Sequence, residues 1–145
     1  MTRVVYLQSR SRARGYTLIE ILIAAVVLAV GLLGLAALQS QAMQSNHSGY
    51  MRAQATSFAY DIADRMRANR VSALAGDYDI AIGGTPTGGT LAGDDLVEWR
   101  AALAGTLPSG GGSVASDGDV FTIIVQWDDT RGDGGLLQFR FLTRL

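Results

Sequence analysis

The chain has 145 residues, with 12 basic and 13 acidic side chains, one histidine and no cysteine. Its formal net charge of −1 and the lack of a basic domain argue against a nucleic-acid-binding protein. Without cysteine no disulfide can form, and the length allows one small folded domain after any leader and anchor are subtracted, so a large catalytic cleft is not expected.

The N-terminal region combines a basic flank with an apolar run. Residues 21–38 contain no charged or polar side chain, and as a helix they extend about 27 Å, close to the hydrocarbon thickness of a bilayer. A basic flank is retained on the cytoplasmic side of a membrane, so the rest of the chain is predicted to face away from the cytoplasm. The flank contains four arginines and no acid: Arg3, Arg10, Arg12 and Arg14.

Two simpler interpretations of this region stay open. A cleaved secretory signal has a similar layout, and Ser40-Gln41-Ala42 is a weak match to its cleavage site. A plain signal anchor would leave Glu20 at the headgroup boundary. Ionisable groups at membrane depth are functional by default, however, and Glu20 stands at the entrance of the apolar run.

Residues 15–20 read Gly-Tyr-Thr-Leu-Ile-Glu, and together with the apolar run they resemble the class III signal of type IV prepilins and type II secretion pseudopilins. The resemblance implies that prepilin peptidase cuts after Gly15 and N-methylates Tyr16, where the family usually has phenylalanine. It also implies that Glu20 neutralises the new amino terminus of a neighbouring subunit in a filament. Removal of residues 1–15 would leave eight arginines against thirteen acids, a net charge of −5.

Beyond residue 38 the helix is predicted to continue to residues 74–76, since residues 39–75 contain no proline and one glycine. Apolar side chains recur at steps of three and four, which predicts a seam against a sheet. They are Met51, Ala55, Phe58, Ile62 and Met66. Charged side chains on the same helix, including the i, i+4 pair Asp61 and Arg65, indicate a solvated face. Within the apolar run, Gly31 and Gly34 indicate close helix approach without a dimerisation motif.

The C-terminal part is predicted to form a small antiparallel sheet with one more helix. Alternation over residues 78–82 predicts a short strand, and residues 83–89 a loop. Asp94 or Asp95 is expected to cap the second helix, which Pro108 ends. Its apolar stripe is Leu96, Trp99, Leu103 and Leu107.

Residues 109–112 then predict a flexible turn, and strands are expected at residues 114–116, 120–127 and 136–143. The first two of these strands flank an Asp-Gly-Asp hairpin turn at residues 117–119. The result is a sheet of three or four strands.

No catalytic or metal-binding constellation is predicted. His47 is the single histidine, and the glycine-rich loop 83–89 lacks the lysine of a phosphate-binding loop. The three aspartates of residues 128–135 do not follow the EF-hand order, so a calcium site is not favoured there. No nucleophile with a base is apparent, and we predict no catalytic residue, metal ligand or cofactor.

Residues 95–100 (Asp-Leu-Val-Glu-Trp-Arg), 124–128 (Ile-Val-Gln-Trp-Asp) and 61–69 further resemble the minor pilin V (PilV) group of type IV pili. This resemblance implies a structural subunit that assists pilus assembly and priming and supports attachment or motility. It implies as partners prepilin peptidase, other minor and major pilins and the inner membrane, and no nucleic acid. A surface ligand is not identified.

The sequence therefore predicts an α+β, type IV pilin-like protein with three segments: a cleaved leader at 1–15, a membrane and filament-core helix at 16–38, and an extracytoplasmic head at 39–145. The predicted location is the inner membrane, with the head in the periplasm, and then the pilus on the cell surface. The alternatives are a type II secretion pseudopilin and, in another class, a membrane-anchored extracytoplasmic enzyme or ligand-binding domain.

Overall fold

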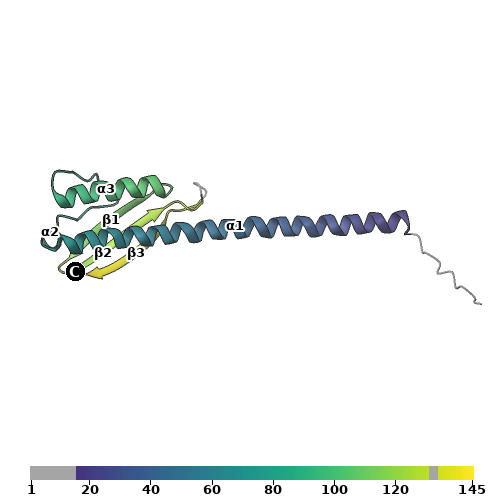
Figure 1. Ribbon diagram of the computed structural model, residues 1–145, viewed down its shortest axis with the longest axis horizontal. Helices are drawn as coiled ribbons and strands as arrows, with labels where there is room; N and C mark the ends of the chain where they lie inside the picture. Colours follow the sequence, from purple (N-terminus) through teal and green to yellow (C-terminus); the bar gives the residue numbers. More distant parts are fainter. Residues whose placement is uncertain (1–15, 131–133) are drawn as a thin grey trace, which may run out of the picture. The chain divides into compact units, whose positions relative to one another are not determined.

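The computed structural model describes residues 16–130 and 134–145, and the chain divides into two compact units between residues 42 and 43. The described elements, in chain order, are α1 (Leu18–Ala68), α2 (Arg70–Leu74), α3 (Leu91–Thr106), β1 (Gly111–Asp117), β2 (Val120–Trp127) and β3 (Leu137–Arg144) (Figure 1). The prediction of an α+β protein with a long N-terminal helix and a small antiparallel sheet is confirmed.

α1 is 51 residues long, so the apolar run and the amphipathic stretch belong to one helix, as predicted. The predicted extension to residues 74–76 is interrupted at Asn69, whose backbone is not helical, before the short α2. The side-chain amide of Asn69 donates a hydrogen bond to the Tyr78 hydroxyl at 3.3 Å. Gly76 follows α2 with a φ of 88°, a left-handed conformation that suits glycine and lets the chain turn away.

The sheet belongs to the second unit and has the order β1-β2-β3, with both pairs antiparallel. Asp117 pairs with Val120, so the β1-β2 hairpin has a two-residue turn, Gly118-Asp119. Gly118 has a φ of 63°, which the primed turns of such hairpins require. The predicted hairpin and final strand are confirmed: β2 has the predicted bounds, β1 begins three residues earlier and ends one later, and β3 is shifted by one residue.

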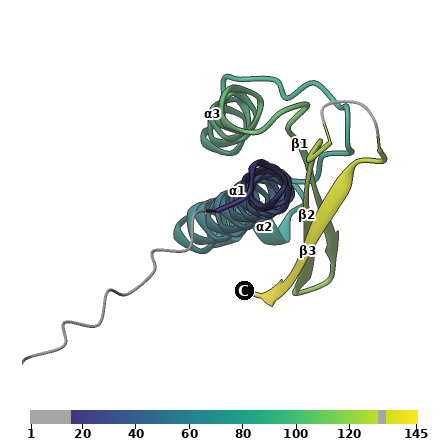
Figure 2. The ribbon, with the colours of Figure 1, turned by 90° about the vertical axis from the view of Figure 1, so that its right-hand side faces the viewer.

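The core of the head lies between the sheet and two helices. α3 and the second half of α1 cover the same face of the sheet (Figure 2). Four members of the predicted α1 seam are buried, and Phe58 is half-buried while its carbonyl accepts a hydrogen bond from Trp99 Nε1 at 2.9 Å. The alternating β2 side chains Phe121, Ile123, Val125 and Trp127 are all buried, as expected.

The predicted cap of α3 is wrong. Thr90 is the N-cap, and its hydroxyl accepts a hydrogen bond from the Gly93 amide at 3.0 Å. The two aspartates have other partners, since Asp94 accepts from the Gly89 amide at 2.9 Å and Asp95 accepts from Tyr78. The helix therefore begins a turn earlier than expected, while its predicted stripe of four apolar residues is buried.

The predicted flexible turn at residues 109–112 is wrong in its second half, because Gly111 and Gly112 begin β1. Their lack of side chains serves packing. A Cβ at Gly112 would collide with the Trp99 ring and approach Leu103 Cδ1 to 2.9 Å. α3 can therefore lie directly on the start of β1, and the Gly112 carbonyl accepts a hydrogen bond from the Arg100 guanidinium.

The strand predicted at residues 78–82 is a single bridge. Ile80 exchanges two backbone hydrogen bonds with Val114 of β1, at 2.9 and 3.0 Å, and the ladder goes no further. Tyr78 is fully buried, and its hydroxyl donates a hydrogen bond to Asp95 at 2.6 Å. This hydrogen bond holds the start of the segment against α3. Gly83, with a φ of 80°, turns the chain away at the other end.

The charged side chains of α1 were expected to form a solvated face, but one of them also binds α3. Arg65 pairs with Asp61 at 3.2 Å, as the spacing predicted, but it also bonds to Asp95 at 3.1 Å and Glu98 at 2.8 Å on α3. These contacts raise the pKa of Arg65, chiefly through Glu98. Together with Tyr78, they form a polar network that joins α1, α3 and the segment between them.

Replacing Gly112 with alanine is expected to destabilise the head by about 1–3 kcal/mol, because the added methyl group overpacks against Trp99. Gly105→Ala is the matched control, since this helical position has open space around it and alanine should stabilise α3 by about 0.5–1 kcal/mol. Urea unfolding followed by near-ultraviolet circular dichroism measures both changes. Equal stability of the two variants would contradict the packing argument.

The second prediction concerns the buried hydroxyl of Tyr78. Burial, together with the hydrogen bond to Asp95, raises the pKa of Tyr78 to about 12. An unfolded tyrosine ionises near pH 10, so the folded head binds this proton more tightly, and the resulting stability is complete below pH 10 and lost as the pH rises towards 12. Tyr78→Phe should remove this loss of unfolding free energy between pH 10 and 12.

Unfolding titrations at a series of pH values test this expectation. Tyr60→Phe is the control, because the Tyr60 side chain is half exposed and stacks on Phe141 with ring centroids 4.7 Å apart. This control should keep the parental pH dependence. Parallel pH profiles for the parent and Tyr78→Phe would contradict the role of Tyr78.

Candidate functional site

The predicted processing segment lies at the start of α1. Thr17 precedes the helix, its carbonyl accepts from the amides of Glu20 at 3.0 Å and Ile21 at 3.2 Å, and its hydroxyl faces the Glu20 amide at 3.3 Å. Thr-x-x-Glu is the capping-box pattern, in which the threonine hydroxyl satisfies the amide three residues later. Residues 17 and 20 of the signal-like motif are thus also the residues that begin the helix.

The structure describes two of the three predicted site residues. Tyr16 is 78% exposed, and Glu20 lies in the exposed first turn of α1. Gly15, the predicted cleavage position, lies outside the described residues. Cleavage after Gly15, methylation of Tyr16 and an assembly role for Glu20 stay predictions. The cap formed by Thr17 was missed, although its Thr-x-x-Glu spacing was visible in the sequence.

The first two-fifths of α1 exposes apolar side chains around its whole circumference. Every described residue of the first unit is exposed, and the helix is long and apolar enough to cross a membrane. Gly31 and Gly34 remain helical, with open space where a Cβ would be. A water-exposed surface of this kind needs lipid or other apolar helices around it. The arrangement is consistent with anchoring in the inner membrane.

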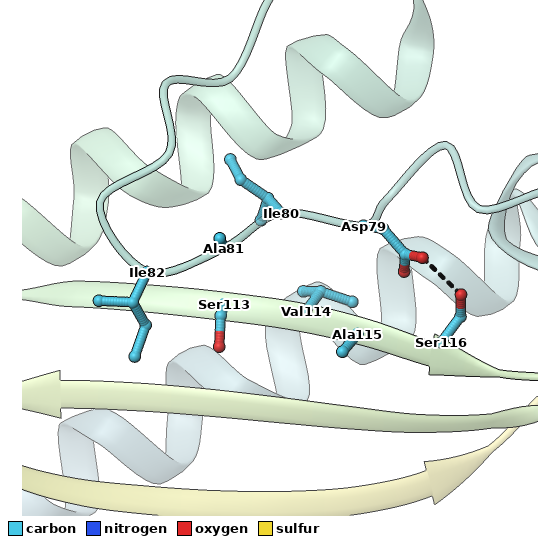
Figure 3. Close-up of a pocket in the computed structure, with 8 residues that line it drawn as sticks. All are labelled: Asp79, Ile80, Ala81, Ile82, Ser113, Val114, Ala115 and Ser116. Carbon is cyan, nitrogen blue, oxygen red and sulfur yellow. Dashed lines mark hydrogen bonds between the residues drawn. The ribbon is translucent and has the colours of Figure 1, made fainter.

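The largest described cavity of the head is widely open to solvent. It has a volume of about 510 Å³ and lies between residues 79–82 and β1, and its walls carry Asp79 and two serines, of which Ser116 donates a hydrogen bond to Asp79 at 2.6 Å (Figure 3). Apolar Ile80, Ile82 and Val114 form much of the remainder. Within residues 16–130 and 134–145, no three histidine, aspartate or glutamate side chains gather as metal ligands would. The predicted aspartate loop is only partly described, because Asp133 lies outside these ranges.

The N-terminal part of the chain matches the model of a known family. Residues 10–36 match the model of the prokaryotic N-terminal methylation motif, which contains both the predicted cleavage position and Glu20. The match supports a type IV pilin-like or pseudopilin-like substrate of prepilin peptidase, a class of structural proteins. No significant match was found among curated proteins or among solved structures. The family evidence therefore concerns the N-terminal segment.

The cap at Thr17 gives a direct prediction. Thr17→Ala removes the acceptor for the Glu20 amide and should cost the first turn about 1 kcal/mol, equivalent to about fivefold faster hydrogen exchange at that amide. Thr17→Ser, which keeps the hydroxyl, should restore slow exchange. Exchange measured by NMR on the chain in detergent micelles reports both variants. If alanine and serine gave the same rate, the cap would have no energetic role.

Proposed function

We propose that this chain is a minor pilin of a type IV pilus, in the group of minor pilin V. Prepilin peptidase removes residues 1–15 and methylates Tyr16. Residues 16–38 hold the subunit in the inner membrane with the head, residues 39–145, in the periplasm. The subunit then enters the pilus, where it helps to prime assembly and supports attachment or motility at the cell surface.

One observation carries the proposal: the methylation motif at residues 10–36 includes the first part of α1, which is apolar and exposed on all sides, and the same helix continues into the head with one buried stripe. A cleaved secretory signal has no need of continuity with the folded domain. A pilin needs it, because the same helix must first sit in lipid and then pack against other subunits.

The role proposed for Glu20 follows from the cost of a charge in such surroundings. A carboxylate among apolar helices is unfavourable unless a cation neutralises it. The amine that cleavage creates on Tyr16 of an adjacent subunit supplies that cation. The pair would form only between processed chains, so it couples processing to assembly.

Mass spectrometry of the N-terminus of the mature protein tests the processing step. The expected terminus is Tyr16 carrying one methyl group, and it should be lost in cells without prepilin peptidase. A terminus close to Met43 would instead indicate ordinary secretion and overturn the proposal. Retention of residues 1–15 in protein that never copurifies with fibres would overturn it as well.

Glu20→Ala should leave membrane insertion and cleavage intact but strongly reduce the amount of this chain in sheared pili, measured by immunoblot against the membrane fraction. Asp77→Ala is the control, since Asp77 is an exposed carboxylate of the head outside the motif. Both variants remove one negative charge. Equal incorporation of the two would remove the proposed role from Glu20.

The type II secretion pseudopilin is the alternative that shares the motif and the helix. Deletion of the gene separates the two functions. Loss of surface motility or piliation with normal export of secreted enzymes supports the pilus, and the opposite phenotype supports the secretion system. Neighbouring genes that encode pilus components would likewise support the pilus, and neighbouring genes that encode secretion components would support the secretion system.

A further inference from the structure

The outer edge of β3 is the open side of the sheet. β3 pairs with β2 along all eight of its residues, and none of the segments described in the structure pairs with its other side (Figure 2). The opposite edge differs, because Ile80 bridges to Val114 and blocks the middle of β1. An unpaired edge of this length presents a row of free backbone donors and acceptors.

The register identifies which backbone groups face outward. Val114 uses both of its backbone groups on Ile80, so it forms a non-hydrogen-bonded pair with Ile123 across β1 and β2. Ile123 must then bond to the other side, to its partner Phe141 in β3. The alternation leaves the N–H and C=O groups of Arg140 and Leu142, and of their neighbours two residues away, pointing out of the sheet.

The side chains of these outward-bonding residues are exposed: Gln138, Arg140, Leu142 and Arg144. Leu142 is 61% exposed, and the Arg140 guanidinium makes no ion pair with a described carboxylate. Arg144 pairs with Asp119 at 3.1 Å, with both side chains more than half exposed. The open edge is therefore flanked by two arginines four residues apart on one face.

We propose that this edge binds an extended acidic segment of a partner protein, which adds to the sheet as a fourth, antiparallel strand. Backbone hydrogen bonds to residues 140 and 142 would hold the segment. Carboxylates four residues apart in the segment would lie opposite Arg140 and Arg144, where opposite charges in cross-strand pairs are favourable. The proposal does not depend on the pilin assignment, because the edge and its charges belong to the head alone.

A second copy of the chain is a poorer occupant by the same argument. Two β3 strands can pair antiparallel with Arg140 of one copy opposite Leu142 of the other, which avoids arginine directly opposite arginine. In this register, Arg140 of each copy still has Arg140 and Arg144 of the other copy as its diagonal neighbours. Registers shifted by two residues in either direction put arginine opposite arginine. Like charges directly opposite one another are destabilising, so charge favours an acidic segment of another protein.

The test uses the full chain in detergent micelles and a seven-residue peptide of alternating threonine and valine with glutamate at its second and sixth positions. Binding is measured by fluorescence anisotropy, with a peptide carrying glutamine in place of glutamate as reference. The acidic peptide should bind the parent more tightly. Arg140→Glu should weaken its binding about fivefold, from one lost attraction and one new repulsion. The double variant Ala101→Glu and Ala104→Glu, at exposed positions of α3, changes the net charge by the same amount and should have no effect.

A second variant tests the backbone contact. Leu142→Pro removes an outward N–H group, a change that edge strands tolerate, and it should abolish peptide binding while the near-ultraviolet spectrum of the head is retained. In the parent, the peptide should slow hydrogen exchange at residues 140 and 142 and leave residues 139 and 141 unchanged. No binding of the acidic peptide, equal binding by Arg140→Glu and by the double variant of Ala101 and Ala104, or dimerisation of the chain through β3 would each overturn the proposal.

Discussion

One helix has to satisfy two different surroundings, and the rest of the structure follows from this constraint. Over residues 21–38 α1 is apolar on every side, whereas from Met51 to Met66 only one stripe is buried. The change in pattern determines where the folded head begins. Small residues also belong to the buried part of α1, since Ala55, Ala59 and Ala63 are fully buried together with Ile62 and Met66.

Much of the fold could be predicted from the sequence because its strongest signals are periodic. Each signal extends over two or more helical turns or several residue pairs, and each corresponds to a described element. These signals are the apolar run and the seam of α1, the stripe of α3 and the alternation of β2. The errors fall where a residue far away in the sequence decides the outcome. Gly112 looked like part of a flexible turn, and only the Trp99 ring beside it explains its place in a strand. Asp95 looked like a cap, but Tyr78 and Arg65 bind it.

The candidate site divides in the same way. The motif itself could be recognised because residues 15–20 are local and are followed immediately by the apolar run, and residues 10–36 match the methylation motif. The cap at Thr17 could also have been predicted from these six residues, because Thr-x-x-Glu is an ordinary signal for the start of a helix. The Arg65 network and the open edge of β3 could not have been predicted, because they depend on how α3 packs against α1 and on the exact pairing of the strands.

The position of the cap has an electrostatic consequence for a processed chain. Aligned peptide dipoles give the start of α1 about half a positive charge, which favours the carboxylate of Glu20 and disfavours a cation just ahead of Thr17 by about 0.3–1 kcal/mol. An ammonium group on Tyr16 would thus be repelled by the end of its own helix. A carboxylate within the first turn, such as that of Glu20, would offset this repulsion and so make the amino terminus and the acid electrostatically dependent on one another.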